Sequence, residues 1–140
     1  MSADPIAAVV AFLKADAGVA ALAGTRVFGL ELPAAEAANM PRKAVVLRAS
    51  GGPSLAAGTY LDHDSQRIDL VSYGETPFEA ERLRRAIFDA LKPVARLVVN
   101  STLVHWIEPA GGFATQRDPD AAWPSAFQSF QVFFAESAAA

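Results

Sequence analysis

A single helix near the middle of the chain constrains the fold more than any other sequence feature. Thr76-Pro77-Phe78-Glu79 is a capping box, in which the threonine hydroxyl accepts a hydrogen bond from one backbone N–H and the glutamate reaches back to another. Pro77, at the first helical position, has its φ angle already set for a helix. Apolar residues then recur at helical spacing, and they are Ala80, Leu83, Ile87 and Leu91. The pattern predicts an amphipathic helix that begins after Thr76, ends before Pro93 and buries one stripe.

Patterns on both sides of this helix predict one further main helix and a series of strands. Asp4 is a good N-cap and Pro5 a good first-turn residue, so a first helix is expected over Pro5–Ala15. A single helical turn is expected at residues 34–38. The strands are expected at about residues 26–30, 43–49, 66–73, 97–100, 103–108 and 126–136. Residues 51–64 and 111–124 are rich in turn formers, and each is predicted to be a loop or turn region.

The order of these elements, α-β-β-β-α-β-β-β, predicts the α+β class. We expect an antiparallel sheet with two main helices packed on one face, in a two-layer sandwich. A chain of 140 residues has the size of one ordinary domain. A single domain is therefore expected over residues 1–140, with Ser137–Ala140 as a loose tail.

The scarcity of charge bears on the partners of the protein. Hydrophobic residues make up 52% of the chain and charged residues only 19%, so a small domain of this kind leaves apolar surface for another subunit. The net charge of −3 argues against wrapping nucleic acid. No cysteine is present, which excludes disulfides and thiolate catalysis. Because no apolar run approaches the roughly 20 residues of a membrane span, we expect no membrane partner.

One short cluster, Asp62-His63-Asp64, carries metal-ligand chemistry. Neighbouring residues of an extended segment point to opposite sides, so three adjacent ligands rarely converge. A distant ligand such as His105 or Asp69 would be required, and a solvated loop is the preferred interpretation. A Ser-His-Asp triad drawn from Ser54, His105 and Asp69 lacks a nucleophile-elbow sequence. His105 is instead interpreted as a packed or half-buried strand residue.

Two further segments contain residue types that are found in phosphate contacts. Gly51-Gly52-Pro53 lacks the lysine and the serine or threonine of a phosphate loop. Arg82, Arg84 and Arg85 of the central helix are interpreted as a solvated face, on which Arg85 faces Glu81 one turn away. The residues therefore predict a non-enzymatic protein with no catalytic, cofactor-binding or metal site.

Three blocks of sequence, in this order and spacing, carry a resemblance over nearly the whole chain. The first is the helix Asp4–Leu13 followed by AALAGTRVF at residues 20–28. The second is QRIDLVSYG at residues 66–74, which runs into Thr76-Pro77 and the central helix. The third is Trp123-Pro124 followed by QSFQV at residues 128–132. The chain resembles the tail terminator proteins of long-tailed bacteriophages and of phage-like gene transfer agents.

The resemblance implies a structural α+β subunit that forms a sixfold (hexameric) ring. The ring would cap the finished tail tube and present a surface to the head-completion or stopper proteins, with DNA passing through its lumen. These proteins, the tail tube protein and further copies of the chain are the implied partners. The implied location is the head–tail junction of a virion or virus-like particle, assembled in the host cytoplasm. Two alternatives stay open: a head-side connector or stopper ring and, from another class, a small hydrolase.

The last strand offers a candidate subunit or tube interface. Phe130, Val132 and Phe134 share one face of the strand, which we expect to line the core against the central helix. Phe133 then points away from the core, on the same face as Ser129 and Gln131. An aromatic residue on the outer face of a strand is typical of a subunit boundary. The loop acids complete the candidate interface, and they are Asp62, Asp64, Asp118 and Asp120.

Overall fold

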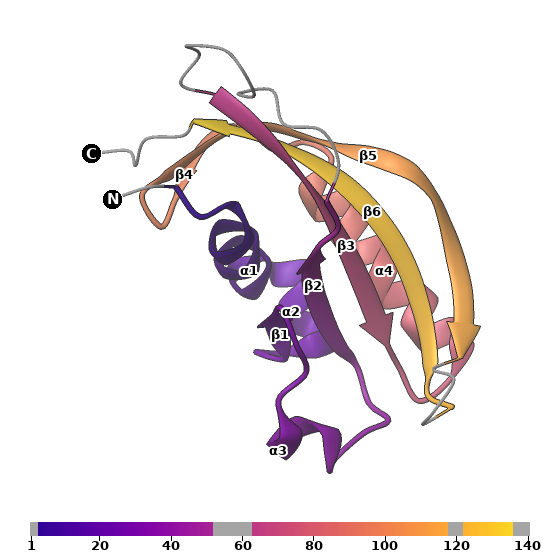
Figure 1. The fold of residues 1–140 in the computed structure, drawn as a ribbon. Coiled ribbons are helices and arrows are strands. Elements are labelled where there is room, and N and C mark those ends of the chain that lie inside the picture. The colour runs from indigo at the N-terminus through magenta and orange to yellow at the C-terminus, as the bar shows by residue number, and fades with distance from the viewer. Residues whose placement is uncertain (1–2, 52–62, 118–121, 136–140) are drawn as a thin grey trace.

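The computed structural model describes residues 3–51, 63–117 and 122–135 of the chain (Figure 1). Four helices are present in this part: α1 (Pro5–Ala15), α2 (Ala17–Ala23), α3 (Ala34–Ala37) and α4 (Pro77–Leu91). Six strands accompany them: β1 (Val27–Gly29), β2 (Ala44–Ala49), β3 (His63–Tyr73), β4 (Ala95–Val99), β5 (Thr102–Arg117) and β6 (Pro124–Ala135).

The six strands form one sheet in the order β1-β2-β3-β6-β5-β4, so the last strand of the chain lies in the middle. All neighbouring pairs are antiparallel except β1 and β2, which are parallel. The expectation of a wholly antiparallel sheet was therefore wrong at this edge. The segment between β1 and β2, which contains α3, carries the chain back so that β2 starts at the same end as β1.

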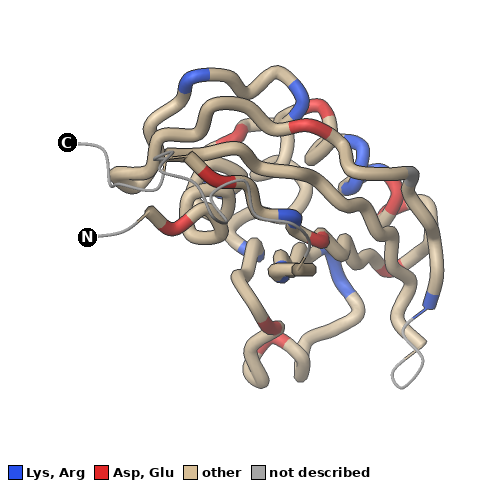
Figure 2. The backbone as a smooth tube through the Cα atoms, turned by 45° about the horizontal axis from the view of Figure 1, so that its top comes forward, with Lys and Arg blue, Asp and Glu red and all other residues tan. Residues whose placement is uncertain are grey.

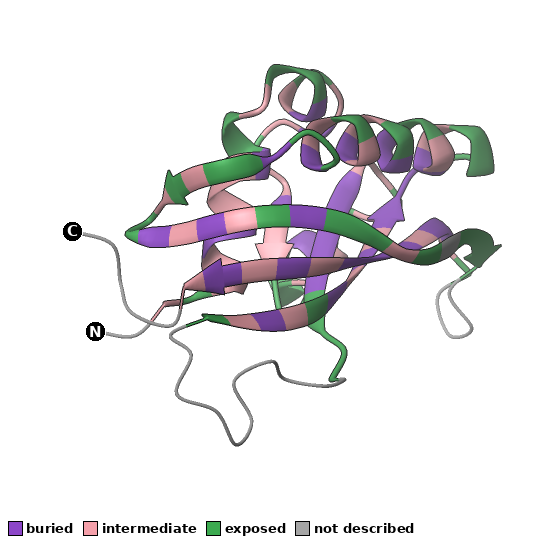
Figure 3. Cartoon of the chain, turned by 90° about the horizontal axis from the view of Figure 1, so that it is seen from above, coloured by how far each residue is buried: buried purple, intermediate pink, exposed green. Residues whose placement is uncertain are grey.

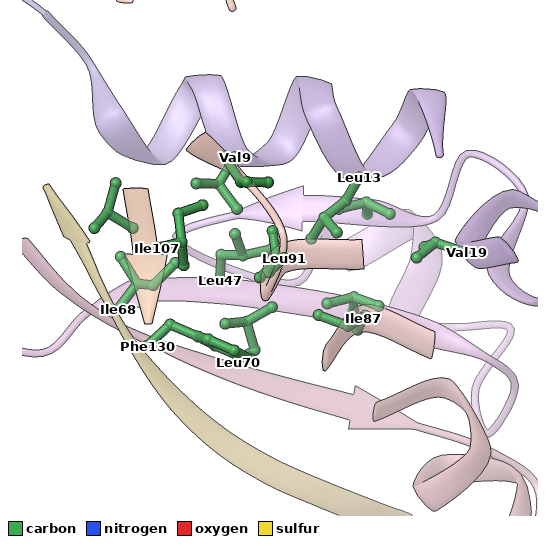
Figure 4. Close-up of a cluster of buried hydrophobic side chains, with 14 of the residues drawn as sticks. Val9, Leu13, Val19, Leu47, Ile68, Leu70, Ile87, Leu91, Ile107 and Phe130 are labelled. Atoms are coloured by element: carbon green, nitrogen blue, oxygen red, sulfur yellow. The ribbon is translucent and has the colours of Figure 1, made fainter. Parts of the chain in front are cut away.

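The main helices cover the sheet from one side (Figure 3), and the sheet curls around them (Figure 1). The expected class of a sheet with helices is confirmed. The described residues form four helices and a curled sheet, which is a more elaborate arrangement than a sandwich with two main helices. The core between helices and sheet gathers α1, α2, α4 and the inner faces of the strands (Figure 4). Its largest fully buried side chains include Phe130, Leu13, Leu47, Ile68, Leu70, Leu83, Ile87 and Leu91.

Asp16 explains why the first two helices are separate. It ends α1, and its carboxylate accepts a hydrogen bond from Val19 N at 3.0 Å, which makes it the N-cap of α2. The two helices meet at an angle of 81°. Among the described residues, no single helix is long and apolar enough to cross a membrane. Only α1 and α2 taken together have that length and apolar composition, and they are bent relative to each other.

The central helix follows its sequence signal with one difference. Thr76 Oγ1 accepts from Glu79 N at 3.2 Å, as the capping box predicts. Glu79 reaches one residue further back than expected, because its carboxylate accepts from Glu75 N at 2.9 Å instead of from the N–H of Thr76. Side chains therefore satisfy the N–H of Glu79, in the first turn, and the N–H of Glu75, which precedes the N-cap.

The arginines of α4 do not form the uniform solvated face that was expected. Arg84 is 2% exposed, and its guanidinium lies 3.9 Å from the centre of the Phe113 ring. It donates two hydrogen bonds to Glu81, at 2.6 and 2.8 Å, and one to Gln128 at 2.7 Å. Glu81 thus pairs directly with Arg84, three residues away, whereas Arg85, which was expected to face it, acts on it only through its charge. Burial is tolerated because the charge is paired and its donors are used.

The strand β5 is much longer than its sequence pattern predicts. It continues to Arg117, whereas residues 111–124 were expected to be turns. The extension is held by β6, with pairs that run from Phe113–Gln128 to Arg117–Pro124. A break in register between Pro109 and Phe113 accommodates Gly111, whose φ of 125° favours glycine. Gln128 closes this break by donating to Gly111 O at 3.0 Å.

Candidate assembly surface

The outer face of the sheet carries a pair of stacked aromatic rings near the end of β6. Phe133 lies between its ladder partners Ser65 on β3 and Trp106 on β5. The rings of Phe133 and Trp106 are 4.3 Å apart between centroids and inclined by only 21°. Phe133 is half-buried, and Trp106 remains 46% exposed. We call these two residues the outer aromatic patch.

The inner face of the same strand behaves as the sequence predicts. Phe130, Val132 and Phe134 are between 0% and 6% exposed and belong to the core cluster together with Leu83 and Ile87. Phe133 is not part of that cluster. Its predicted orientation away from the core is confirmed, although its burial by a partner stays a prediction.

The other candidate interface residues fall into three groups. Gln131 is half-buried beside Phe133 on the outer face. Ser129 is on that face as well, but it is 1% exposed and donates a hydrogen bond to Asp69 at 2.6 Å. Asp64 pairs with Phe134, so its side chain lies on the opposite face from Phe133. The remaining acids, Asp62, Asp118 and Asp120, lie outside the described residues.

A second apolar surface lies beside α1 and the edge strand β1. A groove of about 500 Å³ runs between them, lined by Ile6, Val10, Gly29, Leu30 and neighbouring residues. Leu30 follows directly after β1 and is 64% exposed. We call this surface the α1 groove. The α1 groove is a hollow lined mainly by aliphatic residues, whereas the outer aromatic patch is a pair of stacked rings on the sheet. A contact between the patch of one subunit and the groove of another would therefore join two different surfaces.

Charge does not divide the described surface into large fields of one sign. Basic and acidic residues are interspersed along the described backbone (Figure 2). Within the described ranges, two ion pairs stabilise local structure: Arg84–Glu81 on α4, and Arg42–Glu36 at 2.6 Å beside α3. The hydrogen bond from Arg84 holds the pKa of Glu81 below its ordinary value, and that from Arg42 does the same for Glu36. These contacts explain local folding and do not form a reactive centre.

The described members of the candidate triad and metal cluster, His63, Asp64, Asp69 and His105, do not form a three-ligand site. His105 is half-buried, as expected, and its Nε2 lies 2.9 Å from His63 Nδ1. Asp69 accepts from Ser129, and Ser54 lies outside the described residues. In the described ranges, no group of three or more histidine, cysteine or acidic residues is arranged around a common point for a metal ion.

The fold and these surfaces define a small α+β protein with unlike apolar surfaces, of the kind that assembles with other subunits. The chain belongs to the family described as tail completion protein gp17, which it matches over residues 7–135. It is accordingly a structural protein of a bacteriophage-type tail, located in the virion.

A solved structure supports the fold. One similar chain comes from a structure titled "Virion of native gene transfer agent (GTA) particle", with a TM-score of 0.69 and 22% identity over 94% of both chains. No protein with a curated description matches the chain at a significant level.

Sequence reasoning missed two components of this surface. Trp106 falls within the strand expected at residues 103–108, but its pairing with Phe133 depends on the placement of β5 next to β6. Leu30 gave no local signal, because its exposure depends on where α1 and β1 meet. The sequence therefore predicted one of the two residues of the outer aromatic patch, Phe133, and it did not predict the α1 groove.

Proposed function

We propose that this protein is a tail terminator: six copies form a ring that caps the finished tail tube and joins it to the head-completion proteins. The observation that carries the proposal is the family match over nearly the whole chain. Within tail completion, the sequence resemblance to tail terminators of phages and gene transfer agents favours the terminator role. On this proposal the protein is not an enzyme, and DNA passes through the lumen of the ring.

The two apolar surfaces support a ring. A closed ring with one kind of subunit needs heterologous contacts, in which one patch of a subunit meets a different patch of the next. The outer aromatic patch and the α1 groove are two such unlike surfaces on one chain. Large aromatic residues such as Trp106 are typical of the residues that dominate an interface energetically. We propose that Phe133, with Gln131 beside it, is covered by a neighbouring subunit or by the tail tube.

Two alternatives remain distinguishable by experiment. A head-side connector or stopper would also form a ring, but it would co-purify with head proteins and not with the tube. A small hydrolase would require turnover that depends on its histidines. If His63→Ala and His105→Ala abolished a measurable turnover and left particle assembly intact, the structural role would be wrong.

A mass measurement tests the proposal. The purified chain should be measured by native mass spectrometry, alone and with the tail tube protein. The account predicts a species of six chains, each of 14.7 kDa, bound to the end of the tube. A chain that stays monomeric beside assembled tubes, or that binds only head proteins, would contradict it.

A further inference from the structure

The only two histidines of the chain meet on the sheet, although 42 residues separate them. His63 begins β3 and is exposed, and His105 lies on β5 and is half-buried. Strand β6 runs between these two strands, and the residue that it places opposite His63 is Ala135. A small side chain at this position leaves room for the two imidazole rings to approach each other across β6.

An irregularity in β5 places the second ring. Val104 pairs with Phe134, and Trp106 pairs with Phe133, so His105 is an extra residue between two consecutive ladder positions. Such a β-bulge changes the direction of the side chain that it carries. The bulge therefore brings His105 toward His63, beside the outer aromatic patch.

We propose that His63 and His105 together bind one divalent transition-metal ion. His105 Nε2 and His63 Nδ1 are 2.9 Å apart. Two nitrogens that each lie about 2.05 Å from a metal ion at a right angle to one another are also about 2.9 Å apart. The pair therefore already has the separation of two neighbouring ligands on one ion.

The tilt of the rings supports the same assignment. A straight N–H···N hydrogen bond at this separation would place the ring centres about 5.2 Å apart. The observed centroids are 4.7 Å apart, with the ring planes inclined by 71°. The two rings thus share a bent hydrogen bond, and the same bend directs both nitrogens toward a point beside the line that joins them, where a metal ion would replace the shared proton.

The chemistry of the pair selects the metal. Neutral imidazole suits copper, nickel and zinc, whereas magnesium and calcium prefer oxygen ligands. The right-angled geometry favours Cu²⁺ and Ni²⁺ over tetrahedral Zn²⁺. Since the described residues offer no third protein ligand, water completes the coordination, and binding is weaker than at a site with four protein ligands. The bound ion links β3 to β5 across the end of β6 and stiffens the sheet beneath the outer aromatic patch.

Calorimetry on the protein without a histidine tag tests this site. We expect one Ni²⁺ or Cu²⁺ per chain, with Cu²⁺ bound more tightly, and no binding of Mg²⁺. At a metal concentration roughly a hundredfold above Kd, Tm should rise by about 5 °C or more, because the metal binds only the folded pair tightly. His63→Ala and His105→Ala should each lose at least tenfold in affinity and most of the Tm shift.

Asp64→Asn is the matched control, since Asp64 is adjacent to His63 but lies on the other face of the strand. It should bind the metal as the unaltered protein does. Absence of saturable Ni²⁺ and Cu²⁺ binding would overturn the proposal. So would unchanged binding in both histidine variants, or loss of binding in Asp64→Asn, which would assign the ion to a different ligand set.

Discussion

The two faces of strand β6 differ in what completes them. On the inner face, Phe130 and Val132 are fully buried and Phe134 is 6% exposed, and every one of these side chains is covered by the chain itself. On the outer face, Phe133 is half-buried against Trp106, which keeps 46% of its surface exposed. One strand thus contributes both to the core and to a surface that its own chain leaves unfinished.

The inner residues of β6 stabilise the folded subunit, whereas the outer residues are available for assembly. The inner residues pack against α4. Phe130, for example, contacts Phe88, and the two ring centroids are 6.3 Å apart. Outer residues hold only partial contacts within the subunit, and a partner would add the rest. Substitutions on the inner face should therefore act on stability, and substitutions on the outer face should act on assembly.

The largest effect is expected on the inner face. Phe130→Ala removes a fully buried ring and leaves a cavity between β6 and α4, which should lower the free energy of unfolding by about 4 kcal/mol. Chemical denaturation followed by circular dichroism measures this change. If the free energy of unfolding fell by less than about 1 kcal/mol, the inner face would not be more important for stability than the outer face, and the comparison would be contradicted.

A smaller loss is expected where a buried charge contacts the inner face. Arg84→Met removes the hydrogen bond to Gln128 and both bonds to Glu81, and it leaves Gln128 Oε1 without that donor. The free energy of unfolding should fall by about 2 kcal/mol. Arg82→Met is a matched control on the same helix, at an exposed position, and it should change stability by less than about 0.5 kcal/mol. Equal effects of the two substitutions would mean that Arg84 contributes no more to stability than an exposed arginine, which would contradict its role as a buried, paired charge.

The Glu81–Arg84 pair should also make stability depend on pH. The hydrogen bonds from Arg84 hold the pKa of Glu81 in the folded chain below its ordinary value of 4.5. The stability that the pair contributes is therefore present above about pH 4.5 and is lost as the pH falls through the folded-state pKa. Glu81→Gln should lower the free energy of unfolding by about 1 kcal/mol at neutral pH. Denaturation series at several pH values should show this difference vanish in acid, and a constant difference would contradict the assignment.

The sequence predicted those features whose causes are local. The capping box of Thr76 and Glu79 and the stripe that contains Leu83 and Ile87 need only neighbours within a few turns. The alternation along β6 likewise separated Phe130 from Phe133, because strand periodicity is two residues.

Features that depend on distant partners were not predictable in the same way. The second half of β5 is a strand because β6 pairs with it, although its own residues favour turns. Arg84 is buried because Glu81, Gln128 and Phe113 surround it, and a run of arginines on a helix gives no sign of this. The meeting of His63 and His105 depends on a bulge and on an intervening strand that local pattern does not reveal.

The central claim is that the outer face of β6 serves assembly, and Phe133→Asp tests it most directly. The variant should be examined by circular dichroism for folding and by electron microscopy, with tail tube protein, for rings and capped tails. Phe78→Asp is the matched control, because it makes the same change at an 84% exposed phenylalanine on the first turn of α4, away from the outer aromatic patch. The account predicts that Phe133→Asp is folded, with a stability loss of about 1–2 kcal/mol from the broken ring stack, and forms neither rings nor capped tails. Normal rings and capped tails from the folded Phe133→Asp protein would contradict a role of the outer face in assembly, and an unfolded variant would show instead that the stack of Phe133 on Trp106 is required for folding.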